Sequence, residues 1–357
     1  MKKVIKNIMA FSMVAMLCIT SIGCSKASND DKTVAEMEGL TVETDGAGEG
    51  IKVEFKERTP INIGVLKGPT GMGATKLMED DSIEESSNDY TFTVASSPDE
   101  ITAKIISGEL DIASVPTNLA SVLYNKTEGG VKMLAVNTLG VLHLIHDKSV
   151  EINSIEDLKG KTIYSTGQGA TPEYVIDFIL KQNGIDDVKV EYMQEHAELA
   201  TALISGDVSI GILPEPNVTT ALSKNDKLQH GLDLTKEWEK ACKGTEFEGS
   251  LLSMGCVIVR TEFLNENKDA VDDFLDEYKD SINFANENID MASTKIEKYG
   301  IIPSEDLAKK AIPNCNMVYI DNEEMKNSIS RFLEVLYNAN PKAVGGKLPD
   351  EEFYYTK

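Results

Sequence analysis

A repeated pair of motifs constrains the fold of this chain more than any other feature. The segment GMGAT at 71–75 recurs as GQGAT at 167–171, and EITAKIISG at 100–108 is matched by ELATALISG at 198–206. The two pairs are offset by 96 and 98 residues, so their spacing is nearly kept. Two similar segments in the same order are typical of an internal duplication. We therefore expect two copies of one lobe.

Each copy has the pattern of an α/β unit. Strand-like runs at 61–66, 90–95 and 110–115 alternate with helical patterns at 74–79 and 98–106. Such alternation predicts parallel or mixed sheets with flanking helices. Both Gly-x-Gly segments follow a strand and open a helix, and both Ser-Gly pairs stand where a helix ends with a C-cap glycine. The predicted fold class is α/β, with two sheets around a ligand cleft.

The lobe boundaries follow from the runs between and after the repeats. An apolar strand at 131–137 precedes the second copy, and a buried strand is expected at 251–259. Helical patterns follow at 268–288, 304–311 and 322–337. We expect lobe 1 to comprise 59–138 plus 257–357, and lobe 2 to comprise 139–256. Two chain crossings, near residues 138 and 256, would leave a hinge and a cleft.

The first residues have the pattern of an export signal. Lys2, Lys3 and Lys6 precede an apolar run at 8–22, which is shorter than the ~20 residues that span a bilayer comfortably. Ser-Ile-Gly-Cys at 21–24 resembles the bacterial lipobox. We expect a lipoprotein signal peptide at 1–23, a lipidated Cys24 and a flexible polar tether at 24–58. An ordinary signal peptide with an incidental cysteine is the alternative.

Charge limits the classes of partner. The chain has 35 basic and 59 acidic residues, for a formal charge of -24, which repels nucleic acids and anionic lipid surfaces. Only Arg58, Arg260 and Arg331 could recognise an anion in the bidentate manner of arginine. An anionic ligand would therefore be held mostly by N–H and hydroxyl donors.

Metal and cofactor motifs are missing from the sequence. Neither glycine loop completes a Walker A or a GxGxxG pattern, and no HExxH, CxxC cluster or EF-hand occurs. His143 and His146 would lie on opposite faces of a strand. His196, at a helix start, and His230, in a polar loop, are expected to contact solvent. We expect no cofactor and no metal.

Nucleophilic catalysis is not indicated either. No GxSxG occurs, and the cysteines that follow Cys24 are an odd set without close spacing. Cys256 is expected to be a buried free thiol, although a bridge to Cys242 stays open. The lone Trp238 is expected to pack in the core. Glu215 stands between two prolines at a strand end, where it could bind a ligand, cap a helix or contact the other lobe.

Several of these segments carry a family resemblance. The run SIEDLKGKTI at 154–163, the loop at 167, the turn at 205–207, Pro214-Glu215-Pro216 and the strand near 257–262 resemble bacterial solute-binding proteins of ABC importers. The nearest branch binds nitrate, sulfonates, taurine and thiamine precursors. The resemblance covers about 61–336 and implies the two-lobed fold of periplasmic binding proteins of type II.

The resemblance also implies a function and a set of site residues. It implies a monomeric extracytoplasmic receptor, anchored to the membrane by its lipid, that closes on a small polar or anionic organic solute and delivers it to a permease with a cytoplasmic ATPase. An enzyme of pyrimidine or menaquinone-precursor metabolism, or a sensor without transport, is the alternative. The matching positions that would bind the solute are Lys67, Gly68, Pro69, Thr70, Gly71, Met72, Ser114, Pro116, Thr117, Asn118, Asn137, Thr138, Thr166, Gln168, Gly169, Ala170, Thr171 and Glu215.

Overall fold

A computed structural model describes residues 33–37, 40–44, 51–55 and 58–357 of the chain. The residues up to 57 and those from 58 onward form two separate compact units. The expected signal peptide and Cys24 lie outside the described residues. Among the described residues, no helix combines the length and the apolar character needed to cross a bilayer.

The N-terminal unit contains strands where a tether was expected. The antiparallel sheet has the order β1 (Thr33–Met37), β2 (Leu40–Thr44), β3 (Ile51–Phe55). Both Leu40–Thr44 and Ile51–Phe55 alternate apolar and polar residues, which is the period of a strand. Each alternation is only five residues long and lies in polar surroundings, so the overall composition conceals it.

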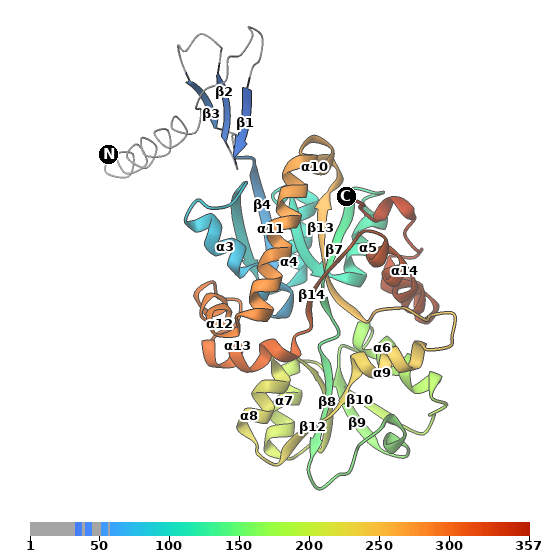
Figure 1. Cartoon of the computed structure of the whole chain (residues 1–357). Helices are drawn as coiled ribbons and strands as arrows, with labels where there is room; N and C mark the ends of the chain where they lie inside the picture. Colours follow the sequence, from blue (N-terminus) through green and yellow to red (C-terminus); the bar gives the residue numbers. More distant parts are fainter. Residues whose placement is uncertain (1–32, 38–39, 45–50, 56–57) are drawn as a thin grey trace. The chain divides into compact units, whose positions relative to one another are not determined.

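Lobe 1 is built on a six-stranded mixed sheet with the order β14-β7-β13-β6-β4-β5 (Figure 1). Its strands are β4 (Pro60–Leu66), β5 (Asp89–Ala95), β6 (Ile112–Pro116), β7 (Val131–Leu139), β13 (Ser253–Arg260) and β14 (Met317–Asp321). β4, β5, β6 and β7 run parallel, whereas β13 and β14 are antiparallel to them. The helices between the parallel strands are α2 (Pro69–Met72), α3 (Thr75–Ser82), α4 (Pro98–Ser107) and α5 (Thr117–Lys126).

Lobe 2 is built on a five-stranded mixed sheet with the order β10-β9-β11-β8-β12. Its strands are β8 (Leu142–Asp147), β9 (Thr162–Thr166), β10 (Lys189–Met193), β11 (Ile210–Pro214) and β12 (Leu228–Asp233). β8 alone is antiparallel to the others. The flanking helices are η1 (Ile155–Leu158), α6 (Thr171–Gln182), α7 (His196–Ser205), α8 (Asn217–Lys224) and α9 (Leu234–Cys242). Two mixed sheets with flanking helices confirm the predicted fold class.

The chain passes between the lobes twice. β7 of lobe 1 ends at Leu139 and β8 of lobe 2 begins at Leu142. The return leads from α9 to β13, which begins at Ser253, so lobe 1 resumes before the expected residue 257. The remaining helices are α10 (Thr261–Glu266), α11 (Lys268–Glu287), α12 (Ile289–Lys298), α13 (Glu305–Ala311), η2 (Ile312–Asn314), α14 (Asn322–Ala339), η3 (Pro341–Val344) and η4 (Glu351–Phe353). Because β7 leads directly into β8, the carboxyl ends of the parallel strands of lobe 1 face the corresponding edge of lobe 2.

The repeated Ser-Gly pairs end helices as predicted. α4 begins at the N-cap Ser97, whose side chain accepts a hydrogen bond from the Asp99 N–H, and it ends at Gly108 with φ 79°. α7 ends at Gly206 with φ 84°. Both glycines adopt the left-handed conformation that closes a helix and that other residues adopt at a cost.

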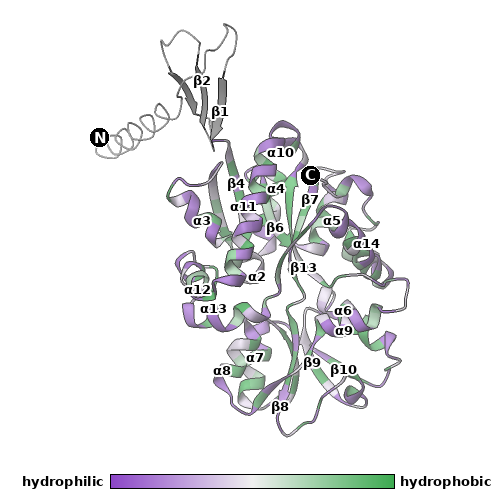
Figure 2. Cartoon of the chain, in the orientation of Figure 1, coloured by the Kyte–Doolittle hydropathy of each residue, from purple (hydrophilic) through white to green (hydrophobic). Residues whose placement is uncertain are grey.

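Apolar side chains fill both lobes and continue between them. Figure 2 shows the central strands as mainly hydrophobic and many of the helices as mixed in hydropathy. Trp238 on α9 is fully buried and packs on Phe178 of α6, with ring centroids 4.6 Å apart. It also meets Phe332 of α14 in lobe 1, at 5.6 Å. The predicted packing role of Trp238 is confirmed, and its aromatic cluster joins the two lobes.

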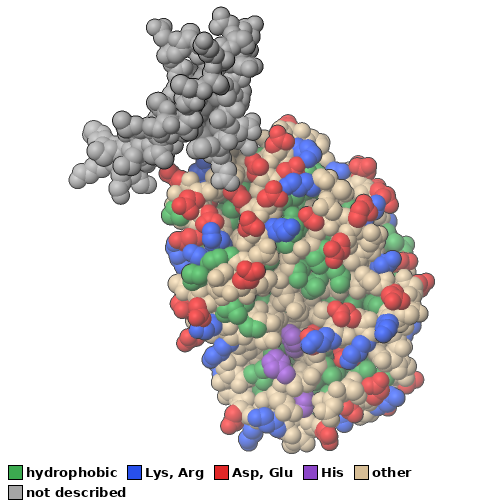
Figure 3. All heavy atoms as spheres, in the orientation of Figure 1, with side chains coloured by type: hydrophobic (Ala, Val, Ile, Leu, Met, Phe, Trp, Pro, Cys, Tyr) green, Lys and Arg blue, Asp and Glu red, His purple; other side chains and the backbone are tan. Residues whose placement is uncertain are grey.

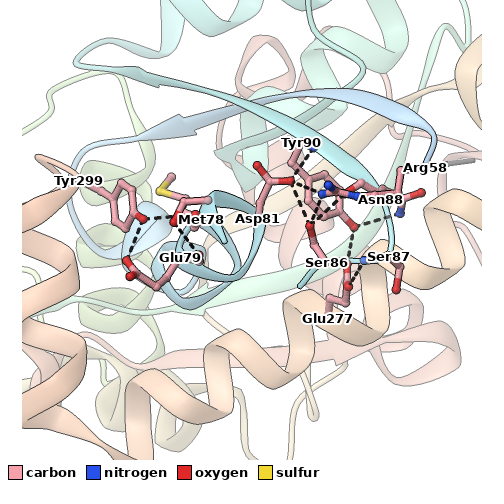
Figure 4. Close-up of polar contacts among 11 residues, drawn as sticks. Arg58, Met78, Glu79, Asp81, Ser86, Ser87, Asn88, Tyr90, Glu277 and Tyr299 are labelled. Carbon is pink, nitrogen blue, oxygen red and sulfur yellow. Dashed lines mark hydrogen bonds and ion pairs between the residues drawn. The ribbon is translucent and has the colours of Figure 1, made fainter. Parts of the chain in front are cut away.

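A polar network fixes the amino ends of β4 and β5 (Figure 4), which are the ends opposite the carboxyl edge of the sheet. Arg58 pairs with Asp81 at 2.7 Å, and its guanidinium also donates to the Asn88 carbonyl. The Tyr90 hydroxyl donates to Glu277 on α11 at 2.6 Å. At the amino end of β6, Arg260 pairs with Asp111 at 2.9 Å in the same way. These contacts are structural, and they occupy two of the three arginines.

Candidate functional site

The candidate site residues of lobe 1 gather at the carboxyl edge of its sheet around Asn137. The Asn137 side-chain amide donates to the Tyr278 hydroxyl at 2.9 Å and, at 3.3 Å each, to the Ser114 hydroxyl and the Thr70 carbonyl. Thr138 donates through Oγ1 to Asn137 Oδ1 at 3.0 Å. All except the partly exposed Thr70 are buried. We call these five residues the Asn137 network.

Close backbone packing holds this network in place. A side chain at Gly255, on β13, would bring its Cβ to 2.2 Å from Thr70 Cγ2 and 2.7 Å from Asn137 Oδ1. Only a glycine therefore fits between β13 and the loop after β4. Tyr278 and Gly255 were not among the residues predicted from sequence. The sequence does contain one signal for Tyr278. A tyrosine on the apolar face of a helix buries a hydroxyl group that needs a hydrogen-bond partner.

The loop after β4 contributes mainly to packing, whereas its residues were predicted to bind the solute. Met72 is fully buried in the lobe 1 core, and a Cβ at Gly71 would lie 2.1 Å from the Leu66 carbonyl oxygen. Gly68 has φ 97°, and its N–H donates to the Ile301 carbonyl. Lys67 is exposed, whereas Pro69 is partly buried. Thr70 is thus the member of this loop that the Asn137 network engages.

The residues after β6 also have partners within the protein. Thr117 Oγ1 and Ser253 Oγ lie 2.6 Å apart and are buried. The Asn118 amide donates to the Ala343 carbonyl of η3 at 3.3 Å, so it contacts the C-terminal segment. Pro116 ends β6 and precedes α5.

The corresponding loop of lobe 2 is open. Gly167 and Gly169 have φ of 76° and 74°, and no atom would lie within 4 Å of a Cβ on Gly169. Gln168, Gly169 and Ala170 are exposed. The loop is held at its two ends, where Thr166 and Thr171 are buried.

Three histidines lie in lobe 2 near this edge. His196 begins α7, and its Nδ1 lies 2.6 Å from Thr166 Oγ1, so the exposed residue has one ring nitrogen engaged. His143 is buried in β8, and its ring meets His230 edge to face at 5.8 Å. His230 lies on β12, so its predicted place in a loop was wrong, although it is exposed. Burial lowers the pKa of the His143 imidazole, which favours its neutral form.

Figure 3 shows histidines on the visible face of the molecule, with acidic and basic side chains scattered over it. No cluster of three or more His, Cys, Asp or Glu residues in the described part of the chain is arranged to hold a metal ion. Cys242, Cys256 and Cys315 are buried free thiols, so the possible Cys242–Cys256 bridge is not formed.

Glu215 occupies the point where lobe 2 meets the first chain crossing. Its N–H donates to the Val141 carbonyl at 3.0 Å, and its Oε2 accepts from the Thr219 N–H of α8 at 3.1 Å. Its side chain is buried, and Oε1 has no partner in the protein. Burial raises the pKa of this carboxyl group despite the hydrogen bonds from Thr219. The buried Cys315 of lobe 1 lies close enough for the Glu215 charge to raise its pKa further.

A groove of about 680 Å³ opens beside the lobe 2 loop, between α6 and α14. Its lining includes Gly169, Tyr174 and Asn340. The Asn340 amide of lobe 1 donates to the Tyr174 hydroxyl at 2.9 Å, which in turn donates to the Gly169 carbonyl at 3.0 Å. The glycine loop of lobe 2 is therefore linked by hydrogen bonds to lobe 1.

Solved structures share this arrangement. An ABC transporter protein from Parabacteroides distasonis is 26% identical, with a TM-score of 0.71 over 84% of this chain and 99% of that chain. The periplasmic aliphatic sulphonate-binding protein SsuA from Escherichia coli is 13% identical, with a TM-score of 0.65 over 84% of this chain and 93% of that chain. The periplasmic nitrate-binding protein NrtA from Synechocystis is 12% identical, with a TM-score of 0.54 over 80% and 82%. The last two identities support a shared fold alone.

Sequence comparison gives a family. No curated protein matches the chain. The NMT1/THI5-like family profile matches residues 89–292, which is more than half of the chain and includes parts of both lobes. With this match and the two-lobed α/β fold of periplasmic binding proteins, the resemblance noted in the sequence is confirmed: the chain belongs to the NMT1/THI5-like family.

Proposed function

We propose that this protein is the extracytoplasmic solute-binding component of an ABC importer. It would bind a small polar or anionic organic solute between its lobes and deliver it to the permease and the ATPase. The observation that carries this proposal is the placement of two polar sheet edges opposite each other, joined by two short crossings. Ligands of open α/β sheets bind at the carboxyl ends of the strands, which is where these edges lie.

The two edges would have different roles in binding. The Asn137 network forms a fixed surface in lobe 1, because its side chains already hydrogen-bond one another. The loop at 167–170 in lobe 2 is exposed and can approach a solute with its backbone N–H groups and the Gln168 amide. Both α2 and α6 begin beside these surfaces, and the N–H groups at a helix start favour polar or negative groups.

Lobe closure would link binding to transport. A solute that contacts both edges stabilises the closed arrangement more than the open one, and this difference in affinity shifts the population. The closed arrangement would present the surface that the permease recognises. We place the division between the lobes at the crossings 139–142 and 250–253.

The N-terminal segment would attach the protein to the membrane. In this proposal the signal peptide is removed before Cys24, which carries the lipid. Intact mass measurement of the membrane-bound protein should give a mature chain that begins at Cys24 with an added diacylglycerol. A chain that begins elsewhere and lacks lipid would contradict this part of the proposal, and a Cys24→Ser variant should be released from the membrane.

Native mass spectrometry of protein purified without refolding tests the central proposal. We expect a stoichiometric small molecule, or binding of one from a panel of amines, amidines, sulfonates and carboxylates. Gln168→Ala should weaken binding of that solute at least tenfold, whereas Asn327→Ala, which truncates an exposed amide on α14, should not change it. A protein that binds nothing, or a Gln168→Ala variant with unchanged affinity, would contradict the proposed site.

A further inference from the structure

Two successive hydrogen bonds join the glycine loop of lobe 2 to the end of α14 in lobe 1. The Asn340 amide donates to the Tyr174 hydroxyl at 2.9 Å, and that hydroxyl donates to the Gly169 carbonyl at 3.0 Å. Tyr174 lies in the first turn of α6, and Asn340 directly follows α14. We call these three residues the lobe relay. None of them lies on a crossing segment, so a rotation of the lobes about the crossings would move Asn340 relative to Tyr174.

We propose that Tyr174 and Asn340 are positioning residues for the loop at 167–170. While the lobes are in contact, Asn340 directs the Tyr174 hydroxyl onto the Gly169 carbonyl and so holds the loop in the conformation described here. The conformation of the lobe 2 loop therefore depends on the position of lobe 1. This dependence is a property of the free protein, and its value for solute binding rests on the proposed function.

The capping contact of η3 fixes which way the Asn340 amide faces. Asn340 Oδ1 accepts from the Lys342 N–H at 3.1 Å, so the NH2 group is the part of the side chain turned toward Tyr174. The segment η3 is itself attached to lobe 1, because Ser121 of α5 donates to the Val344 carbonyl at 2.9 Å. The donor of the lobe relay therefore moves with lobe 1.

The hydroxyl group of Tyr174 transmits this contact to the loop. A tyrosine hydroxyl has one hydrogen to donate and also accepts hydrogen bonds. Because Asn340 donates to its oxygen, the hydroxyl hydrogen cannot point toward Asn340 and is available for the Gly169 carbonyl. Successive hydrogen bonds also polarise and strengthen one another. Without the amide, the hydroxyl is free to turn toward water.

The other contacts of the loop lie within lobe 2. The Gly169 N–H donates to the Glu173 carboxylate, and the Ala170 N–H donates to the Gly167 carbonyl at 3.0 Å. Neither contact involves lobe 1. Glycines permit many backbone conformations, so hydrogen bonds must select one of them for this loop. The Gly169 carbonyl is thus the point at which the position of lobe 1 affects the loop.

The surroundings of the lobe relay allow its hydrogen bonds to form and break. Tyr174 and Asn340 lie in the wall of the groove between α6 and α14, which has a volume of about 680 Å³. Asn340 is partly exposed there. Water from the groove can replace either partner when the lobes separate, since bridging water satisfies polar groups nearly as well as a direct contact. Separation therefore leaves no unsatisfied group behind.

Hydrogen–deuterium exchange of the full chain without solute tests the lobe relay, with mass spectrometry of the peptide that contains 167–171. Asn340→Ser keeps a side-chain oxygen to cap η3 but lacks the amide that reaches Tyr174. We expect the amides of this peptide to exchange at least threefold faster in the variant, although the change is in the other lobe. Asn338→Ser alters an exposed asparagine of α14 that lines the same groove, and it should leave the exchange unchanged.

A double-mutant cycle identifies the path of the effect. Tyr174→Phe keeps the aromatic ring and removes the hydroxyl, so it should speed exchange of the loop by itself. If Asn340 acts through this hydroxyl, adding Asn340→Ser to Tyr174→Phe should bring no further increase. If Asn340→Ser does not fold, Asn340→Asp takes its place in the cycle. Its carboxylate keeps an oxygen for η3 and draws the hydroxyl hydrogen away from Gly169, so the same increase is expected.

The outcomes separate this inference from the proposed function. Loop exchange that is unchanged in the Asn340 variant, or that rises equally in Asn338→Ser, would overturn the inference and leave the receptor function in place. Effects of the two changes that multiply in the double variant would also overturn it. Because no solute is added, a protein that binds no solute would contradict the proposed function without altering this measurement.

Discussion

The two glycine loops have nearly the same sequence, yet they differ in structure. In lobe 1, Gly71 lies inside the one-turn helix α2, packed against the Leu66 carbonyl. In lobe 2, Gly167 and Gly169 both have positive φ, and Gly169 faces open space. Proline positions differ accordingly: Pro69 is the first residue of the short helix α2, ahead of the lobe 1 glycines, and Pro172 is the second residue of α6, after the lobe 2 pair.

This difference indicates that the two sheet edges differ in how firmly the protein holds them. The lobe 1 edge is a rigid surface, because its buried polar groups satisfy one another in the Asn137 network. The lobe 2 edge keeps an exposed loop and the unpaired oxygen of Glu215. A duplicated motif therefore preserves the place of a glycine loop at the sheet edge, and the neighbouring residues decide how firmly that loop is held.

Gly255→Ala should have the largest effect on stability, because it forces a Cβ into the lobe 1 edge. The added atom would lie 2.2 Å from Thr70 and 2.7 Å from Asn137, so the loop and the network must move. We expect a loss of about 1 to 3 kcal/mol in the free energy of unfolding. Urea denaturation measures this, and a variant as stable as the wild type would show that the lobe 1 edge is not tightly packed.

Asn137→Ala should come next in the order of effects. It removes the donor shared by Tyr278, Ser114 and the Thr70 carbonyl. Leaving buried polar groups without this partner should destabilise the protein by about 2 kcal/mol. The matched change in lobe 2, Gln168→Ala, removes an exposed amide and should alter stability by less than about 0.5 kcal/mol. Equal losses of stability in Asn137→Ala and Gln168→Ala would contradict the expected difference in rigidity between the two edges.

Gly169→Ala should have a smaller effect than either lobe 1 change. Nothing obstructs a Cβ at this position, so the cost arises from φ of 74° alone. A non-glycine residue in the left-handed region costs roughly 1 kcal/mol. Thermal unfolding would measure this cost. A loss as large as that of Gly255→Ala would mean that the lobe 2 loop is more constrained than its open surroundings indicate.

The smallest expected effect is a pH dependence that comes from lobe 2. Burial places the pKa of His143 below its ordinary value of 6.5, so below that pH the unfolded chain binds a proton that the folded chain resists. This contribution to stability is complete above pH 6.5 and declines as the pH falls through that value. We expect wild-type protein to lose more thermal stability than His143→Gln between about pH 7.5 and 5.5. Parallel curves for the two proteins would contradict this.

Much of the fold could be predicted from sequence because it depends on local pattern. The alternation from Ile61 onward and the two Ser-Gly pairs specify elements whose signals lie within a few residues. The strands at 33–55 were missed because each alternation is short. The strand expected at 251–259 was placed two residues early, because Leu251 and Leu252 continue the apolar run ahead of the start of β13 at Ser253.

The site was harder to predict because its contacts are distant in sequence. Asn137 and Tyr278 are 141 residues apart, and only the packing of α11 against the sheet brings them together. Asn118 matched the pattern of a binding residue, but its amide contacts Ala343, which follows it by 225 residues. Glu215 could be singled out by its flanking prolines, whereas its unpaired oxygen could be recognised only from the surrounding fold.

The aromatic cluster at the lobe boundary has a practical consequence. The chain contains a single tryptophan, and Trp238 in lobe 2 packs against Phe332 in lobe 1. The tryptophan fluorescence of the chain therefore originates at one place, where a rotation of the lobes would change the surroundings of the indole ring. The lobe closure proposed above would therefore have an optical reporter in the unmodified chain, without an attached dye.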